Sequence, residues 1–429
     1  MVSQAKQRVL DLIGVAFAGY ATMEFPRLVV NYMASLGGKP EATLIQTPGK
    51  IPALNAALGN AACAHAIDMD DGHRFAALHP GTVVIPAALA AAEMKSATTR
   101  EFLSGIVVGY EIMVRVGAAI NPSSLKRGFH ATGIAGPFGA AAAAANILRL
   151  SQAETVNALG LAGLQASGLL QVNHELEGAK SKPINPGRAA VSGLLSSILA
   201  QNGAPGPLEI FEGDDGFLRA FADQVQIETL TRGLGQSYEI NNTYDKLYAA
   251  CRHAHACIDA ALEAAHRGSV APFDIEEITV ETYSVGVQLA GIVRPPTPSA
   301  ARFSIPFSVA LALIEQNASA DKYTEATVAD QKIQSLADKV QLRVSEKWEQ
   351  AYPNQRGATV EIVDAQDRRW HSEVALAKGE PENPASWDEL YGKFLANATT
   401  LASEKQARLL GEAIRNLDDL SLEEFVGMI

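Results

Sequence analysis

Stretches built almost entirely of alanine, glycine and aliphatic residues recur through the first two thirds of this 429-residue chain. Hydrophobic residues make up 48% of the chain and aromatic residues only 6%, so much of the apolar content is alanine. Alanine is the strongest helix former, and its small side chain lets helices approach closely. Apolar residues recur at helical spacing in Lys6–Ala18, Ile51–Ile67, Val84–Lys95, Thr99–Ile120, Gly136–Leu148 and Ala189–Gln201. The chain is therefore predicted to be mainly α-helical.

Two runs in this region contain almost only small or apolar residues. They are the AAAAAAN run near Ala141 and the LAGLQASGLL run at Leu161–Leu170. A helix that is apolar on every side is normally buried. Both runs are therefore expected in the centre of a domain or at a subunit interface.

The pattern changes after about residue 268. Alternating or β-branched segments predict strands at Ile275–Tyr283, Val340–Val344, Ala358–Val363 and Trp370–Leu376, with helices at Ser304–Gln316 and Thr324–Lys339. Ser386 and Glu389 then have the spacing of a capping box that begins another helix. A chain of this length usually forms more than one domain. We predict a large all-helical domain over 1–268, a smaller inserted α+β domain over 269–385, and C-terminal helices over 386–429 that return to the helical domain.

Charge and cysteine content exclude several classes of function. The formal net charge of -12 argues against nucleic acid or an anionic membrane surface as a partner. Three cysteines without a CxxC spacing predict neither a disulfide framework nor a structural zinc site. The N-terminus lacks the order of regions found in a signal peptide, and the apolar stretches are interrupted before they reach the length of a membrane span. We therefore expect a cytoplasmic protein.

Ionisable residues lie in four segments whose other residues are mostly small or apolar. The segments are Ala64–Gly81 with His65, Asp68, Asp70, Asp71 and His79; Arg127–Gly133 with His130; Gly178–Arg188 with Lys182; and Tyr244–Asp259 with Lys246, Arg252, His253 and His255. His65 and Asp68 are three residues apart, which predicts one helical face. His79, His130 and Lys182 each precede an apolar helix, whose free amides favour carboxylates.

Each of these residues also has a structural interpretation. A histidine before a helix is usually a surface or capping residue, and vicinal Asp70 and Asp71 are usually solvated or bonded within a turn. His253 and His255 could form a metal pair, but no third ligand has a recognisable spacing, so no metal site is predicted. No P-loop, GxSxG motif or GxGxxG after a strand is present in the sequence.

Taken together, the segments resemble the MmgE/PrpD family of 2-methylcitrate dehydratases, cis-aconitate decarboxylases and iminodisuccinate epimerases. The matching elements follow the family's order: AKQRVLDLIGVAFAG, NAACAHAIDMDD with HPG and VIPAALAAAE, GYEIMVRVG, RGFHATGIAGPFGAAAAAA, KSKPINPGRAA, FEGDDGF, KLYAACRHAHACIDAAL, RFSIPFSVALAL and NPASWDELYGKF. The resemblance covers nearly the whole chain.

This resemblance implies a helical domain built from both chain ends, an inserted α+β domain, a homodimer, and an interdomain active site without a metal or organic cofactor. Asp68, His79, His130, Lys182 and Lys246 match residues that line that site. The chain departs from the family where several members have threonine after the paired aspartates, because it has Gly72 and then His73. It also has Cys251 where the decarboxylases place a histidine.

We therefore predict a cofactor-independent lyase that removes a proton next to a carboxylate of a small di- or tricarboxylic acid. The predicted catalytic residues are His130, His79, Asp68 and Lys182, and the predicted substrate contacts are Lys246, Arg252, His73 and Cys251. His130 is assigned as the base and His79 as the acid, or the reverse. Two alternatives stay open, namely an epimerase of an amino- or imino-dicarboxylate and a catalytically silent acid-binding relative.

Overall fold

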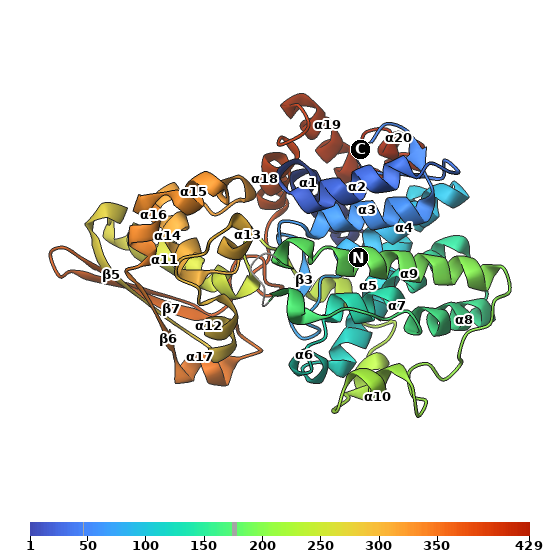
Figure 1. The fold of residues 1–429 in the computed structure, drawn as a ribbon, viewed down its shortest axis with the longest axis horizontal. Helices are drawn as coiled ribbons and strands as arrows, with labels where there is room; N and C mark the ends of the chain where they lie inside the picture. The colour runs from blue at the N-terminus through green and yellow to red at the C-terminus, as the bar shows by residue number, and fades with distance from the viewer. Residues whose placement is uncertain (46, 174–177) are drawn as a thin grey trace.

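The computed structural model describes residues 1–45, 47–173 and 178–429 and divides into a large helical part and a smaller part built around a sheet (Figure 1). This arrangement confirms the predicted fold class, a mainly α protein with a smaller α+β domain. Apolar periodicity explains it, since each amphipathic helix must bury its apolar face against another element.

The helical part is centred on α7. Its helices are α1 (Val2–Thr22), α2 (Glu24–Ser35), α3 (Ala53–His65), α4 (Gly81–Lys95), α5 (Thr99–Ile120), α6 (Ser123–Lys126), α7 (Ala131–Leu148), α8 (Gln152–Gly163), α9 (Ile184–Gln201) and α10 (Phe217–Phe221). The alanine run lies in α7, which packs against α4, α5, α8 and α9 and is buried along almost its whole length. Burial of this run is as predicted. The run at 161–170 differs, because Leu164 and Leu169 are exposed beyond the end of α8.

The C-terminal helices lie against the first helix of the chain. They are α18 (Trp387–Ala398), α19 (Glu404–Arg415) and α20 (Leu422–Val426), and α18 and α19 both contact α1 (Figure 1). Phe394 of α18 packs directly on Gly14 of α1, and the capping box of Ser386 and Glu389 begins α18 as expected. Buried Lys393 donates a hydrogen bond of 2.8 Å to the carbonyl of Met69.

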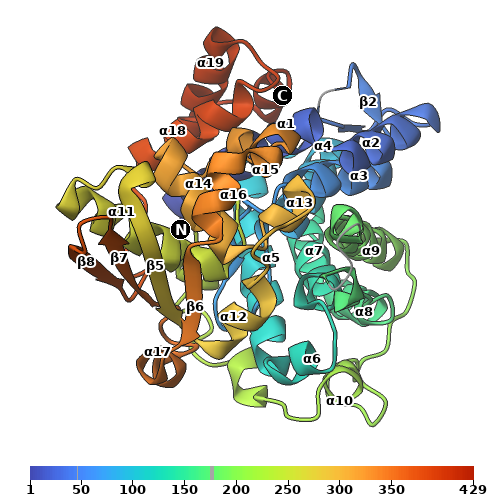
Figure 2. The same ribbon diagram turned by 60° about the vertical axis from the view of Figure 1, so that its left-hand side comes forward.

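The smaller part is a four-stranded mixed sheet covered by helices. The strands are β5 (Ile275–Thr282), β6 (Val340–Val344), β7 (Ala358–Asp364) and β8 (Arg369–Val374), in the order β6-β5-β7-β8 (Figure 2). Strand β6 is parallel to β5, and the other neighbours are antiparallel. The helices are α11 (Arg252–Gly268), α12 (Ser284–Ala290), α13 (Pro298–Ala301), α14 (Ile305–Glu315), α15 (Glu325–Ala329), α16 (Gln331–Ala337) and α17 (Glu346–Ala351). The single helix expected at 324–339 is divided at Asp330, which caps α16.

Helix α11 packs on the sheet and not on the helical bundle. Its neighbours are β7, β8 and α14, and its buried alanines belong to the same apolar core as β5 and β7. A boundary at residue 268 would separate α11 from the elements on which it packs. By its packing, α11 goes with the smaller part. Helical periodicity shows that a helix has a buried face but not which core receives it.

Short two-stranded ribbons complete the fold. Strand β1 (Ala42–Thr43) pairs with β2 (Lys50–Ile51), and β3 (Gly72–His73) pairs with β4 (Thr243–Tyr244). The β3–β4 pair brings the segment after α3 next to the segment that leads into the smaller part. A side chain at Gly72 would collide with the Tyr244 ring, so this approach needs glycine.

In the part of the chain that the structure describes, two helices, α5 and α7, are long and apolar enough to cross a membrane by length and composition, or three spans if the bent pair α1–α2 counts as one. The expectation that no apolar stretch reaches that length was therefore wrong. Burial inside the protein also explains why these helices are so apolar, since 94% of the apolar window of α7 is buried among neighbouring helices.

We predict that the contact between α7 and α9 depends on Gly193. A methyl group there would lie 2.4 Å from the Pro137 carbonyl oxygen, so Gly193→Ala should lower the free energy of unfolding by about 1–3 kcal/mol. Gly392→Ala is the matched control, because nothing lies within 4 Å of that position in α18 and alanine favours helix by up to about 1 kcal/mol. Chemical denaturation of both variants measures the difference. Equal effects would mean that α7 and α9 are less closely packed than described.

Candidate active site

The carboxylate of Asp68 lies between two buried lysines. Its Oδ1 accepts a hydrogen bond of 2.8 Å from Lys182 Nζ, and its Oδ2 accepts one of 2.9 Å from Lys246 Nζ. Lys246 also donates to the Asp68 carbonyl at 2.7 Å. The three residues come from separate segments, after α3, before α9 and after β4. They form one charge-assisted network inside the protein.

Asp68 has a left-handed backbone conformation, with φ of 52°. Aspartate tolerates this region better than most residues. The conformation also corrects an expectation: α3 ends at His65, so His65 and Asp68 do not share a helical face.

Burial and the lysines act on Asp68 in opposite directions. Asp68, Lys182 and Lys246 are 6%, 8% and 1% exposed. Burial alone would raise the pKa of Asp68, but the two ammonium groups overcome this and hold the pKa well below its usual value. Burial would likewise lower the pKa of Lys246, but Asp68 outweighs it and the pKa is raised. Asp68 and Lys246 therefore stay charged at neutral pH.

His79 is held in one tautomer by the main chain. Its Nδ1 lies 2.8 Å from the Asp71 carbonyl oxygen and 3.4 Å from Asp70 Oδ2. Both neighbours are acceptors, so Nδ1 carries the proton and Nε2 has the free lone pair. His65 supports this arrangement, because its Nδ1 lies 2.8 Å from the same Asp70 oxygen and its ring centroid lies 4.9 Å from that of His79.

His130 is held in the opposite tautomer. Its Nδ1 lies 3.0 Å from the side-chain nitrogen of Asn185, which also faces the Leu169 carbonyl and so acts as a donor. An accepting Nδ1 leaves the proton on Nε2. The His130 ring centroid lies 5.9 Å from that of His65, so the three imidazoles form one group.

Both imidazoles are neutral at pH 7. Burial lowers the pKa of His79 to about 3, although Asp70 partly opposes the shift. Burial, followed by the nearby charge of Lys182, also holds the pKa of His130 well below its ordinary value. An anion bound beside these rings would favour their protonated forms, so the site gains basicity when an acid binds.

The N-terminal ends of three helices meet here, as expected from the positions of His79, His130 and Lys182. His130 is the N-cap residue of α7, and Asn185 beside it is in the first turn of α9. The His79 amide donates to Thr132 Oγ1 in the first turn of α7 at 3.1 Å. The helix dipoles therefore add positive potential to the cluster.

Asp70 and Asp71 are buried, so of the two structural interpretations, solvation or hydrogen bonds within a turn, solvation is excluded. Burial opposes ionisation of Asp70, but His65 and His79 outweigh it and lower its pKa. Asp71 accepts from the Gly81 amide at 3.0 Å and from the Tyr110 hydroxyl at 2.9 Å, and burial raises its pKa to about 7. Their role is to fix the loop between α3 and α4.

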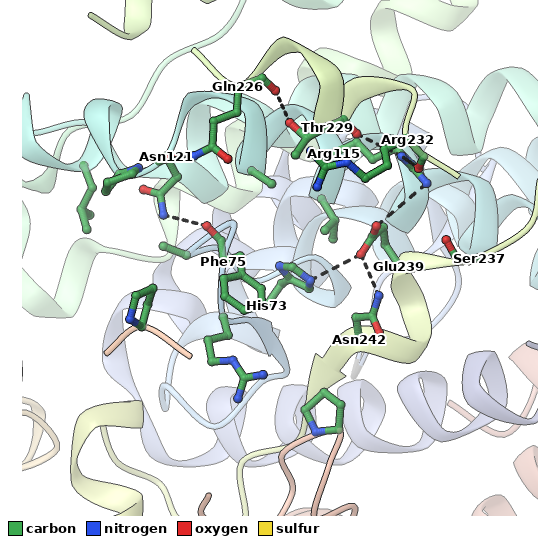
Figure 3. A pocket seen from close by; sticks show the side chains of 18 of the residues that line it. His73, Phe75, Arg115, Asn121, Gln226, Thr229, Arg232, Ser237, Glu239 and Asn242 are labelled. Atoms are coloured by element: carbon green, nitrogen blue, oxygen red, sulfur yellow. Dashed lines mark hydrogen bonds and ion pairs between the residues drawn. The ribbon is translucent and has the colours of Figure 1, made fainter. Parts of the chain in front are cut away.

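Two predicted substrate contacts lie away from this cluster. The Arg252 guanidinium donates hydrogen bonds to Glu380 at 2.9 Å and to the Asp245 carbonyl at 3.0 Å. These donors are therefore used within the protein. His73 faces Glu239 across 3.5 Å in a separate cavity of about 670 Å³ (Figure 3). The sequence did not show that these two side chains are engaged elsewhere, because their partners Glu380 and Glu239 are distant in sequence.

Cys251, another predicted substrate contact, is the N-cap residue of α11 and lies next to the cluster. Burial raises the pKa of its thiol, and the charges of Asp68 and Lys246 both reach it. Its amide donates to the Arg302 carbonyl at 2.7 Å.

The large cavity is a weaker candidate for the chemistry despite its size. On its wall, Arg74 already pairs with Glu380 and Arg115 with Glu111. Glu239 already has the His73 ring as its partner. Hydrogen bonding from His73 lowers the pKa of Glu239 to about 2. The imidazoles of His79 and His130, whose pKa values are lowered, lie in the other cluster, and perturbed groups in a cleft mark functional sites.

The smaller part closes the cluster with Ser299, Arg302 and Phe303. Together with His65, Asp68 and Lys182 they enclose about 10 Å³, the room of a single water. Arg302 was not singled out from the sequence, although it begins the RFSIPF segment, because nothing local distinguishes it from a surface arginine.

His65, Asp70 and His79 are the described residues that could hold a metal ion, with donor atoms within 4.8 Å of one another. The His65–Asp70 distance of 2.8 Å is shorter than the roughly 3.3 Å between two ligands on a tetrahedral zinc ion. Hydrogen bonding therefore accounts for this geometry without an ion.

The fold and the site define a two-domain, mainly helical protein with imidazoles and paired ammonium groups at the junction of its domains. Residues 1–230 match the MmgE/PrpD N-terminal domain, and residues 248–419 match the MmgE/PrpD C-terminal domain. The chain therefore belongs to the MmgE/PrpD family.

The chain is also similar to several characterised proteins. It is 27% identical over 387 residues to the cis-aconitate decarboxylase-like protein oryM of Aspergillus oryzae, covering 85% of this chain and 79% of the relative. It is 25% identical to cis-aconitate decarboxylase of Aspergillus terreus, covering 98% and 90%. It is 24% identical to cis-aconitate decarboxylase of Homo sapiens, covering 98% and 88%.

We predict that His79 makes the folded protein less stable in acid. Its pKa of about 3 lies below the ordinary value of 6.5, so below pH 6.5 the unfolded chain binds a proton that the folded chain does not. The free energy of unfolding should then fall by up to about 1.4 kcal/mol per pH unit from pH 6.5 towards 3. Thermal unfolding at pH 7.5 and 5.5 should show a smaller loss for His79→Gln than for the wild type.

His371→Gln is the control, because that histidine is exposed. It should follow the wild type at both pH values. Parallel profiles for His79→Gln and the wild type would contradict a partly buried, neutral His79.

Proposed function

We propose that the protein is a lyase of the dehydratase or decarboxylase type that acts on a small di- or tricarboxylic acid. The observation that carries this proposal is the cluster in which Asp68 joins Lys182 and Lys246 beside the oppositely oriented tautomers of His79 and His130. Ammonium groups bind carboxylates and stabilise the enolate-like charge that forms next to one. Similarity to cis-aconitate decarboxylases supports the same substrate class.

The tautomers favour His79 as the base and His130 as the acid, the reverse of the assignment preferred from sequence. His79 has its free lone pair on Nε2, so it can take a proton from the carbon next to a carboxylate. His130 carries its proton on Nε2 and so has no lone pair there to act as the base. To act as the acid it first takes a second proton, which a bound anion favours, and then gives one proton away and returns to the neutral ring. Asp70 would steady the imidazolium that forms on His79.

The two lyase reactions use these groups differently. In dehydration, His79 takes the carbon-bound proton, the carbon–oxygen bond breaks, and His130 protonates the leaving hydroxyl to give water. In decarboxylation, the bond to one carboxylate breaks, carbon dioxide leaves with no electrons from that bond, and His130 protonates the remaining carbanion. Lys182 and Lys246 would hold the charge in both cases.

Two positions bear on the choice of substrate. The chain has Gly72 and Cys251 at positions where the resemblance places a threonine in several members and a histidine in the decarboxylases. Glycine has no hydroxyl to offer at its position, and the half-buried thiol of Cys251 is a weak hydrogen-bond donor that does not carry a positive charge. We therefore keep the substrate class wider than cis-aconitate itself.

We predict that the protein converts at least one acid from a set of cis-aconitate, 2-methylcitrate and citrate in deuterated water. Nuclear magnetic resonance and a carbon dioxide assay follow the products. An alkene or carbon dioxide supports the lyase, whereas deuterated substrate of inverted configuration from an iminodisuccinate or amino-dicarboxylate supports an epimerase. His79→Gln and His130→Gln should each lower kcat by at least about 100-fold.

The two variants separate the roles of the histidines. If elimination is the reaction, His130→Gln should still exchange the carbon-bound proton with solvent deuterium, and His79→Gln should not. His371→Gln should keep wild-type activity, because it is exposed and remote from the cluster. Full activity in His79→Gln would overturn the proposed base, and binding without any turnover of the acids would favour the silent relative.

A further inference from the structure

We propose that Arg302 forms a carboxylate-binding subsite through which the smaller domain holds one end of the substrate. This inference rests on the proposed function, since it names a further contact of the same site. Arg302 follows α13 and lines the small cavity with Asp68 and Lys182. It is 2% exposed.

Arg302 lacks the carboxylate partner that two other buried arginines, Arg8 and Arg252, have. Arg8 pairs with Asp245, and Arg252 pairs with Glu380. No Asp or Glu of the described residues lies within ion-pair distance of Arg302. Burying a guanidinium without an anion is unfavourable, so an anion that enters the cavity would gain a ready partner.

The hydrogen bonds of Arg302 also leave donors unused. Among the residues that the structure describes, its Nη1 has a hydrogen bond only to the sulfur of Met23, at 3.5 Å, and its buried Nε has no partner. A thioether is a weak acceptor, and the other close neighbour is the face of the Tyr323 ring, 5.5 Å from the guanidinium carbon. Arginine donors match both oxygens of a carboxylate, which makes this fork suited to bidentate binding.

The main chain fixes Arg302 in this place. Its carbonyl accepts from the Cys251 amide at 2.7 Å, and α13 before it contacts the segment Gly178–Ser181 that precedes Lys182. The adjacent Phe303 ring lies 5.3 Å from Lys182 Nζ. Arg302 and Lys182 therefore face the same space from different domains.

The chemistry selects acids with at least two carboxylates. Lys182 and Lys246 share Asp68 and are already partly compensated, so one substrate carboxylate can bind near them. Arg302 is left for a second carboxylate at the other end. Because Arg302 belongs to the smaller domain, a substrate with both groups would join the two domains, and the segment around α13 has to move for it to enter the 10 Å³ space.

The test compares Arg302→Met and Arg302→Lys with Arg356→Lys. Arg356 is also buried and also has no carboxylate within ion-pair distance among the described residues, but it lines the large cavity. KM and kcat are measured for cis-aconitate or for whichever polyacid the wild type converts, and thermal shifts are measured with cis-aconitate and with the monoacid crotonate.

Arg302→Met should raise KM roughly tenfold to a hundredfold, the usual loss for a hydrogen bond to a charged group. Its thermal shift with cis-aconitate should be lost, while any shift with crotonate is unchanged. Arg302→Lys should fall between the wild type and Arg302→Met, because lysine keeps the charge but not the fork. Arg356→Lys should leave KM within threefold of the wild type, whatever its melting temperature.

Added methylguanidinium should restore part of the activity of Arg302→Met, which a merely structural role would not allow. If Arg302→Met does not fold, the comparison of the two lysine variants decides. A KM for Arg302→Lys or Arg302→Met within threefold of the wild type overturns the subsite while the proposed function stands. A wild type that neither binds nor converts any polyacid removes the proposed function itself.

Discussion

The bonds from Asp68 to Lys182 and Lys246 hold the site together, because they tie three distant segments to one carboxylate. Two ammonium groups this deeply buried would repel each other and lose much hydration free energy without that carboxylate between them. The left-handed turn at Asp68 aims the carboxylate, and the β3–β4 pair sets the distance from Lys246. His65 and His79 are then placed by the same loop, through Asp70 and Asp71.

Local patterns in the sequence were sufficient for most of the fold. The periodicity at Thr99–Ile120 and the β-branched run at Val340–Val344 correspond to α5 and β6 at both ends. These elements are set by which face of a short segment is apolar, and that is visible along the chain. The assignment of α11 is different, because its apolar face fits either core, and only its contacts with β7 and β8 decide between them.

The site could be predicted only in part, for the same reason. Asp68, His79, His130, Lys182 and Lys246 do lie in one cluster, and the resemblance located them by order along the chain. Arg252 was misplaced because its partner Glu380 is 128 positions away, and Arg302 was missed because an unpaired buried arginine is defined by what is absent around it. The tautomers of the two histidines likewise depend on a carbonyl and an amide that no motif specifies.

The packing of α18 and α19 on α1 has a consequence for how the chain is made. Helix α1 buries its surface against α18 and α19, and Lys393 of α18 reaches the carbonyl of Met69 beside Asp68. During synthesis, α1 therefore leaves the ribosome long before these partners exist. The helical domain can reach its final packing only after α18 and α19 have emerged, with the inserted sheet domain free to fold first.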